Sequence, residues 1–518
     1  MCPIFCRPFF SLLLACVAFA CVKPPLPLPA LGAREGDAFL ALQLWEKEAM
    51  RFVHAQNAWL WQHWSVGAPL EVASLYAPFE AFFSEQTWRE MQNLPTPPSP
   101  AQACALQNLQ ALVLGELLAG KLRKHNHAVA LVEDSLTVMY QAKDFPWYEL
   151  GRLLAHEKTA LHRQNLWLYS LKKARPLEAA LQAKEKKTAQ ALEHLGVDEA
   201  RATQLFRGVA LEALSLPLQT RLEETHSSWC AHVEAMAAQH KGVPKATRAD
   251  LPFFFQAKLP GSHLHFPAKQ QAAVVDAVFE RLGLWPTPRL VRHIGETQAA
   301  LPLPLALNGG LEASWLSFTP VAGPHSLRHL LGEMGRTLAW AYVAPNQWAC
   351  RHLGPPILSQ ASALVFAQLA QEEAWWEEQA LPESLAKAWA RAFAAQAEFE
   401  FRKMAAHFLA QWATRALGEE EAWGTYVSIQ AEVLCVQPLE AEAARLYVDR
   451  EAFFAMADML RAQLLAERMG ETLRARFGQR WWNVPEAGVW LKALWQEGNA
   501  VREASSTLPS WPQTLPPL

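Results

Sequence analysis

Apolar residues recur at intervals of three and four along most of this chain, from about residue 35 onward. The segment EGDAFLALQLWEKEAMRFVHAQNAWLWQHW, which begins at Glu35, is typical. This spacing places apolar side chains on one face of an α-helix. Since 51% of the 518 residues are hydrophobic, such helices can bury a large core. The pattern predicts a mostly α-helical protein.

One region interrupts the helical pattern, between Asp250 and Gly323. It contains many prolines and short apolar runs such as LPFFF, LPLPLAL and ASWLSFTPV. Short runs of this kind are typical of β-strands. Helical periodicity returns at Pro324. We therefore expect two helical halves, 35–245 and 246–506, with a small strand-bearing insert in the second.

The first residues have the composition of an export signal. Arg7 supplies a positive charge, and a mostly apolar run follows from Phe9 to Ala20. That run is too short to span a bilayer and fits the core of a signal peptide. Because it ends in AFAC, residues 1–21 are predicted to be either a cleaved signal peptide or a lipoprotein leader that is lipidated at Cys21.

The two ends of the chain are expected to lie outside the folded body. The proline-rich stretch 22–34 is predicted to be a stiff linker, and 507–518 a loose tail. With the leader, this organisation predicts an exported protein that is periplasmic or anchored to a bacterial cell envelope only through an N-terminal lipid. A start codon set too far upstream is the alternative explanation for the apolar leader.

Four cysteines follow the leader, and their spacing is uninformative. Cys104, Cys230, Cys350 and Cys435 lie far apart and form no CxxC pair, so a zinc ribbon is excluded. One or two disulfides could form in an oxidising compartment, but the sequence does not pair the cysteines. Buried free thiols are the favoured expectation.

A helix predicted over 324–343 carries the clearest functional pattern. Its apolar residues form one stripe, and the opposite arc holds His325, His329, Gly332, Glu333, Arg336 and Trp340. Within that arc, GEMGR has the spacing of a helical HExxH zinc motif. Glu333 takes the position of the general base, but Gly332 and Arg336 replace the two histidines.

The order of features around GEMGR resembles the thimet-oligopeptidase and oligoendopeptidase F group of zinc peptidases, which are HExxH gluzincins, and more loosely the angiotensin-converting-enzyme group. GEMGR matches their HExGH helix at Glu333 and Gly335, and GPPILSQASALVF has Gln360 where the family carries a third, glutamate ligand. FGQRWWNVPEAGVWLKALWQEG follows a C-terminal pattern of bacterial members, and RADLPFFF precedes the strands as in the family. The resemblance covers roughly residues 245 to 500 and implies a two-halved helical body with a central channel.

The resemblance implies a zinc site that has been lost. Glycine offers no ligand at Gly332, the cationic Arg336 would repel a metal ion, and Gln360 offers only a neutral amide. We therefore expect no cofactor and no peptidase activity, with Glu333 as an inactive former general base. We hypothesise that Arg336 pairs with Glu333 in place of the metal. A retained channel would bind peptides or other extended segments.

Two alternatives remain open. An active zinc-dependent oligopeptidase would need non-standard ligands, for which His325 and His329, one helical turn apart, are the candidates. A structural envelope lipoprotein would instead fill the channel with its own side chains. A nucleic-acid partner is not expected, because the net charge is -3 and no lysine- or arginine-rich block is present.

Overall fold

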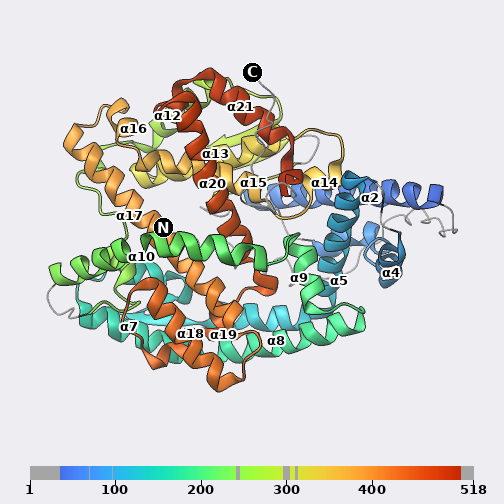
Figure 1. The fold of residues 1–518 in the computed structure, drawn as a ribbon, viewed down its shortest axis with the longest axis horizontal. Helices are drawn as coiled ribbons and strands as arrows, with labels where there is room; N and C mark the ends of the chain where they lie inside the picture. Colours follow the sequence, from blue (N-terminus) through green and yellow to red (C-terminus); the bar gives the residue numbers. More distant parts are fainter. Residues whose placement is uncertain are drawn as a thin grey trace.

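The structure is a computed structural model that describes residues 35–502, apart from 69–70, 96, 98, 241–244, 296–303 and 310–312 (Figure 1). The described chain is mostly α-helical with two small sheets, as the periodicity predicts. The predicted leader with Cys21, the whole linker, and the tail lie outside the described residues.

The first half is built from helices and one short hairpin. Its main elements are α2 (Glu35–Val66), α3 (Val72–Tyr76), α4 (Glu85–Asn93), α5 (Pro100–Ser135), β1 (Thr137–Tyr140), β2 (Lys143–Pro146), α6 (Leu150–His156), α7 (Ala160–Lys173), α8 (Arg175–His194), α9 (Glu199–Arg207) and α10 (Glu212–Gln239). Strands β1 and β2 pair antiparallel. The sequence does not predict this hairpin, because strands of four residues show too little alternation to be recognised.

The second half contains the remaining helices and a three-stranded sheet. Its main elements are α11 (Leu251–Phe254), α12 (Ala268–Arg281), β3 (Leu290–Ile294), β4 (Leu305–Leu307), β5 (Ser314–Phe318), α13 (Pro324–Ala341), α14 (Trp348–His352), α15 (Ile357–Ala367), α16 (Glu373–Glu378), α17 (Glu383–Thr414), α18 (Glu419–Leu434), α19 (Leu446–Asp449), α20 (Met456–Phe477) and α21 (Pro485–Gln496). The central strand β5 pairs parallel with β3 and antiparallel with β4.

These strands lie inside the predicted insert, but part of that insert is helical. The run LPFFF forms α11 instead of a strand, because the Asp250 carbonyl accepts hydrogen bonds from the amides of Phe253 and Phe254 and so closes a helical turn. Helix α12 also falls in this region. An apolar run that is buried all round carries no periodicity that separates helix from strand.

The packed cores do not follow the predicted boundary at residue 245. One core combines Trp45 and Leu109 with Trp348, and another combines Trp229 with Phe408. In Figure 1, α12, α16 and α21 lie in the upper part of the molecule and α7, α8 and α18 in the lower part, and α17 contacts both α16 and α18. The two halves of the sequence are therefore interwoven in the fold.

Among the described helices, only α5 is long and apolar enough to cross a membrane. In this fold it packs against α2, α4, α8, α9 and α14, and 56% of its most apolar window is buried inside the protein. Burial in the core accounts for its composition.

Two disulfide bonds join the halves. Cys104 on α5 is bonded to Cys350 on α14, and Cys230 on α10 is bonded to Cys435, which follows α18; the Cα–Cα distances are 5.3 and 5.2 Å. The expectation of free thiols is therefore wrong. The partners are separated by 246 and 205 residues, so only the tertiary fold brings them together.

Candidate functional site

Helix α13 is held by its apolar stripe, as the sequence predicts. Leu327, Leu330, Leu331, Met334 and Leu338 each have a solvent-exposed fraction of 0%. They belong to a core that also includes residues of α12, α15, α20 and α21. The stripe fixes the rotation of α13 about its axis, and therefore the direction of its polar arc.

Two glycines let α13 approach α15 closely. A Cβ atom added to Gly332 would lie 3.1 Å from the Ala363 carbonyl oxygen, and one added to Gly335 would lie 3.0 Å from the Ser362 carbonyl oxygen and 2.5 Å from the Phe366 ring. These separations are shorter than ordinary van der Waals contact. Gly332 therefore has a packing role, and a histidine could not occupy its position without moving α15.

The close approach brings three predicted site residues together. The Arg336 guanidinium donates a hydrogen bond to Gln360 Oε1 at 2.7 Å, and its Nη1 lies 3.3 Å from Glu333 Oε2. The exposed side-chain fractions are 25% for Arg336 and 17% for Glu333, so the ion pair is partly accessible to solvent. Arg336 thus occupies the space between the carboxylate and the amide.

This donor set does not fit a divalent cation. Gly332 has no side chain, and the only charged group between Glu333 and Gln360 is a guanidinium, which stays protonated in proteins. The amide oxygen of Gln360 is already engaged by that cation. Zinc sites use thiolates, imidazoles and carboxylates, of which only one carboxylate is present here.

The two histidines on the same arc lie one turn apart. Nε2 of His325 is 3.2 Å from the Ala257 carbonyl oxygen, and the imidazole packs edge-on against Phe393. Burial lowers the pKa of His325 to about 4, and burial together with the neighbouring Arg328 lowers the pKa of His329 to about 3. Both imidazoles are therefore neutral at pH 7, but no described carboxylate, thiol or third imidazole joins them in a three-ligand group.

The C-terminal tryptophan-rich motif contacts α15, the helix that carries Gln360. Trp495 on α21 donates its indole N–H to Ser362 Oγ on α15 at 2.8 Å, and Trp482 donates to Glu378 at 2.9 Å. Both indoles are completely buried. The motif therefore fixes α15, and with it Gln360, in place.

The RADLPFFF segment has a different role, because it forms buried ion pairs with both α7 and α19. Nη2 of Arg248 lies 3.0 Å from Asp449 Oδ2, and Asp250 pairs with the fully buried Arg163 on α7 at 2.8 Å. Burial opposes ionisation of Asp449, but Arg445, His407 and Arg248 outweigh it and lower the pKa of this carboxyl well below its usual range. These charges hold the segment between α7 and α19.

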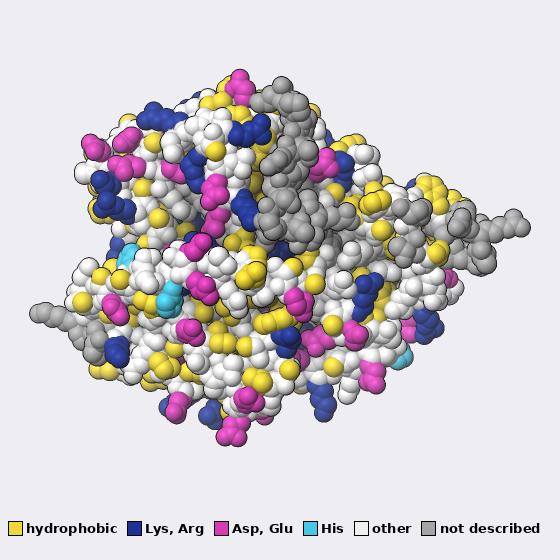
Figure 2. Space-filling model, in the orientation of Figure 1, with side chains coloured by type: hydrophobic (Ala, Val, Ile, Leu, Met, Phe, Trp, Pro, Cys, Tyr) yellow, Lys and Arg dark blue, Asp and Glu magenta, His cyan; other side chains and the backbone are white. Residues whose placement is uncertain are grey.

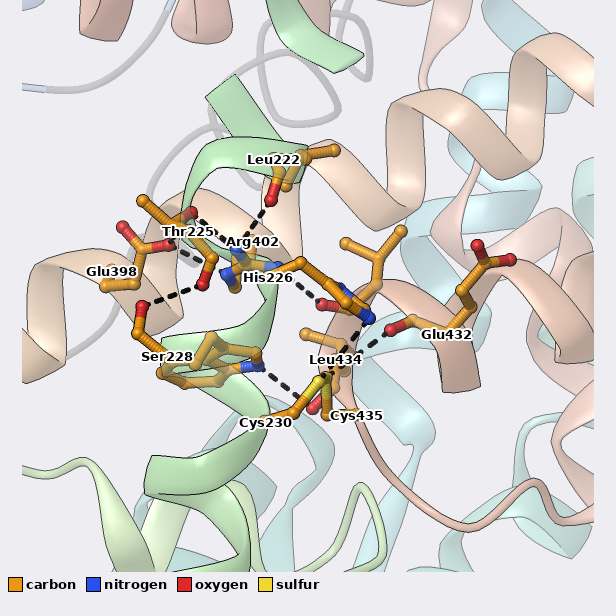
Figure 3. The surroundings of a disulfide bond; sticks show 12 residues. Leu222, Thr225, His226, Ser228, Cys230, Glu398, Arg402, Glu432, Leu434 and Cys435 are labelled. Carbon is orange, nitrogen blue, oxygen red and sulfur yellow. Dashed lines mark hydrogen bonds and ion pairs between the residues drawn. A yellow bond between two sulfur atoms is a disulfide. The ribbon is translucent and has the colours of Figure 1, made fainter. Parts of the chain in front are cut away.

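The structure also assembles a group that sequence reasoning missed. Among the described residues, the only three potential metal-ligand atoms that lie within 4.8 Å of one another belong to His226, Cys230 and Cys435. Nε2 of His226 is 3.5 Å from Cys230 Sγ (Figure 3). The one sequence signal was the four-residue spacing of His226 and Cys230, since Cys435 comes from a distant part of the chain.

No known protein-family model matches the sequence. No curated protein matches it either. The resemblance to zinc oligopeptidases therefore depends on the residues quoted above and stays a prediction.

Proposed function

We propose that this chain is an exported peptide-binding protein with the body of a zinc oligopeptidase and no peptidase activity. The observation that carries the proposal is the contact of Arg336 with both Glu333 and Gln360. In the resemblance, these two positions are those of the general base and of the third zinc ligand. A guanidinium between them balances the carboxylate charge without a metal ion.

Partly exposed polar residues on α13 support the binding of a peptide. The side chain of His329 remains partly accessible to solvent, although the surrounding protein lowers the pKa of its imidazole to about 3. The partly exposed Arg336 and Glu333 can donate to and accept from the amides of an extended peptide.

Export is supported by two independent features. The apolar leader with its AFAC end fits a signal peptide. The two disulfides fit an oxidising compartment such as the periplasm, because disulfides are rare in a reducing cytosol.

The test uses the purified, oxidised mature protein. We expect no bound zinc, no chelator-sensitive cleavage of a fluorogenic peptide library, and a rise in melting temperature with at least one pool of peptides. Arg336→Met should weaken that binding several-fold. Arg328→Met is the matched control, because Arg328 lies on the same helix but contacts Glu400, at 3.6 Å.

Stoichiometric zinc, or hydrolysis that a chelator abolishes, would overturn the proposal in favour of an active enzyme. If no peptide pool shifts the melting temperature, the peptide-binding part fails and a structural role is left. Mass spectrometry of the mature N-terminus tests export and lipidation of Cys21 separately.

A further inference from the structure

The two disulfides differ in their surroundings. Cys104 and Cys350 are buried, with exposed fractions of 6% and 3%. Cys230 and Cys435 are partly exposed, and the imidazole of His226 lies beside them, one helical turn before Cys230. Figure 3 shows the three side chains together where α10 meets the end of α18. Only the second disulfide is therefore accessible to a reductant and next to a third potential ligand.

We propose that reduction of the Cys230–Cys435 disulfide creates a zinc site made of the two thiolates and the His226 imidazole. Thiolate and imidazole are the ligands that zinc prefers, and three protein ligands leave a fourth position for water. The site is independent of Arg336 and of the proposed peptide-binding function.

The distances suit tetrahedral zinc. A nitrogen and a sulfur bound to one zinc ion lie roughly 3.6 Å apart, given typical Zn–N and Zn–S bonds. The observed separation of His226 Nε2 and Cys230 Sγ is 3.5 Å. Two zinc-bound sulfurs lie roughly 3.8 Å apart, so the sulfurs need only separate by side-chain rotation once their bond is broken.

Other contacts keep the two segments together without the disulfide. The indole of Trp229 donates to the Leu434 carbonyl at 3.1 Å, joining α10 directly to the residue before Cys435. The buried Arg402 on α17 donates to the Leu222 carbonyl on α10 (Figure 3) and to the Val433 carbonyl on α18, each at 3.1 Å. The ligands therefore stay close when the bond between Cys230 and Cys435 opens.

The redox step is ordinary thiol–disulfide exchange with an external dithiol. One thiolate of the dithiol attacks a sulfur of the Cys230–Cys435 bond, forms a mixed disulfide with that cysteine and releases the other cysteine as a thiolate. The second thiolate of the dithiol then attacks the mixed disulfide and releases the remaining cysteine. The dithiol is oxidised to its disulfide, and the protein gains two thiols. Zinc binding then releases the two thiol protons. The protein would bind zinc here only in its reduced form.

The experiment starts with brief treatment of the folded protein by dithiothreitol, followed by anaerobic removal of the reductant. Mass tagging of free thiols should label Cys230 and Cys435 but not Cys104 or Cys350, and circular dichroism should be unchanged. The reduced protein should take up one zinc ion per chain. With Co²⁺ as a probe, thiolate-to-metal charge-transfer absorption should appear.

Variants decide which side chains bind the metal. Cys435→Ser should abolish the charge-transfer absorption, and His226→Ala should lower zinc affinity about 10-fold or more. His232→Ala is the control on the same helix and should bind zinc like the wild type. The proposal is overturned if the reduced, folded protein takes up no zinc or if His226→Ala binds it with unchanged affinity. It is also overturned if the Cys230–Cys435 bond resists reduction until the protein unfolds. Arg336→Met should leave zinc uptake unchanged, which separates this test from that of the proposed function.

Discussion

Helices α13 and α10 each carry a histidine one turn away from a second potential metal ligand, but their neighbours differ. Beside α13, the contacts of His325 are a backbone carbonyl and the Phe393 ring, and the nearby charge is a guanidinium. Beside α10, the end of α18 brings Cys435 against Cys230 and His226. At α10 the third potential ligand comes from a distant segment, and no such segment completes a group at α13 among the described residues.

The α10 region is held by a disulfide bond, whereas α13 is held by the packing of its apolar stripe, and this difference predicts the largest effect. Replacement of both Cys230 and Cys435 by alanine should lower the free energy of unfolding by roughly 2–5 kcal/mol, because the bond closes a long loop of the unfolded chain. Denaturant unfolding measures the loss. Replacement of Cys104 and Cys350 by alanine is the matched variant and should cost at least as much, since it also leaves a buried cavity. A cost below about 1 kcal/mol for the first pair would show that α10 does not depend on its covalent link.

A matched pair of glycine substitutions tests the packing of the helices at the two regions. Gly335→Ala places a methyl group against the Ser362 carbonyl and the Phe366 ring, so we expect a net loss of about 1–2 kcal/mol. Gly424→Ala on α18 adds the same methyl group where nothing lies within 4 Å, so it should stabilise by up to about 1 kcal/mol through helix propensity. Thermal unfolding shows whether each variant is stabilised or destabilised. Equal effects would contradict the close approach of α13 to α15.

Acid should weaken the α13 region through His329, whose pKa is lowered in the folded protein. The folded-state pKa of His329 is lowered to about 3, so between that value and the unfolded value near 6.5 the unfolded chain binds more protons. Stability from this group is therefore present at pH 7 and is lost as the pH falls through that window. We expect His329→Gln to reduce the loss of unfolding free energy between pH 7 and pH 5 by about 1–2 kcal/mol. Urea unfolding at the two pH values measures it, and an unchanged pH dependence would contradict the lowered pKa of His329.

The smallest effect is expected for the ion pair between Glu333 and Arg336. Glu333 and Arg336 are partly exposed, so a double-mutant cycle with Glu333→Gln and Arg336→Met should give a coupling of about 0.5–1 kcal/mol. Denaturant unfolding of the four proteins measures it. A coupling above about 3 kcal/mol would identify a fully buried pair, and zero coupling would indicate that the contact does not form in solution.

Much of the fold could be predicted from local patterns. The position of α13 follows from Pro324 at its start and from its apolar stripe, and the contact of Arg336 with Glu333 follows from their spacing of three residues on one helix. Local patterns did not predict the features that are determined by tertiary contacts. LPFFF is buried on several sides and shows no period, and the packing role of Gly332 is set by a carbonyl on another helix.

The cysteine group was beyond sequence reasoning for a similar reason. Four cysteines allow three pairings, and chain separation does not choose among them. Burial differs strongly between Cys104 and Cys230, but that difference arises from tertiary packing. The ligand set around His226 exists only because α10 and α18 meet.

The order of the bonded cysteines along the chain has a consequence for biosynthesis. Cys104 pairs with the third of these four cysteines and Cys230 with the fourth, so the two covalent loops overlap along the chain. As the polypeptide emerges, Cys104 and Cys230 are available to each other long before their native partners have been made. An oxidase that joins thiols in order of appearance would produce the wrong link. Correct pairing therefore requires either oxidation delayed until all four cysteines have emerged or an isomerase that reshuffles the first bond.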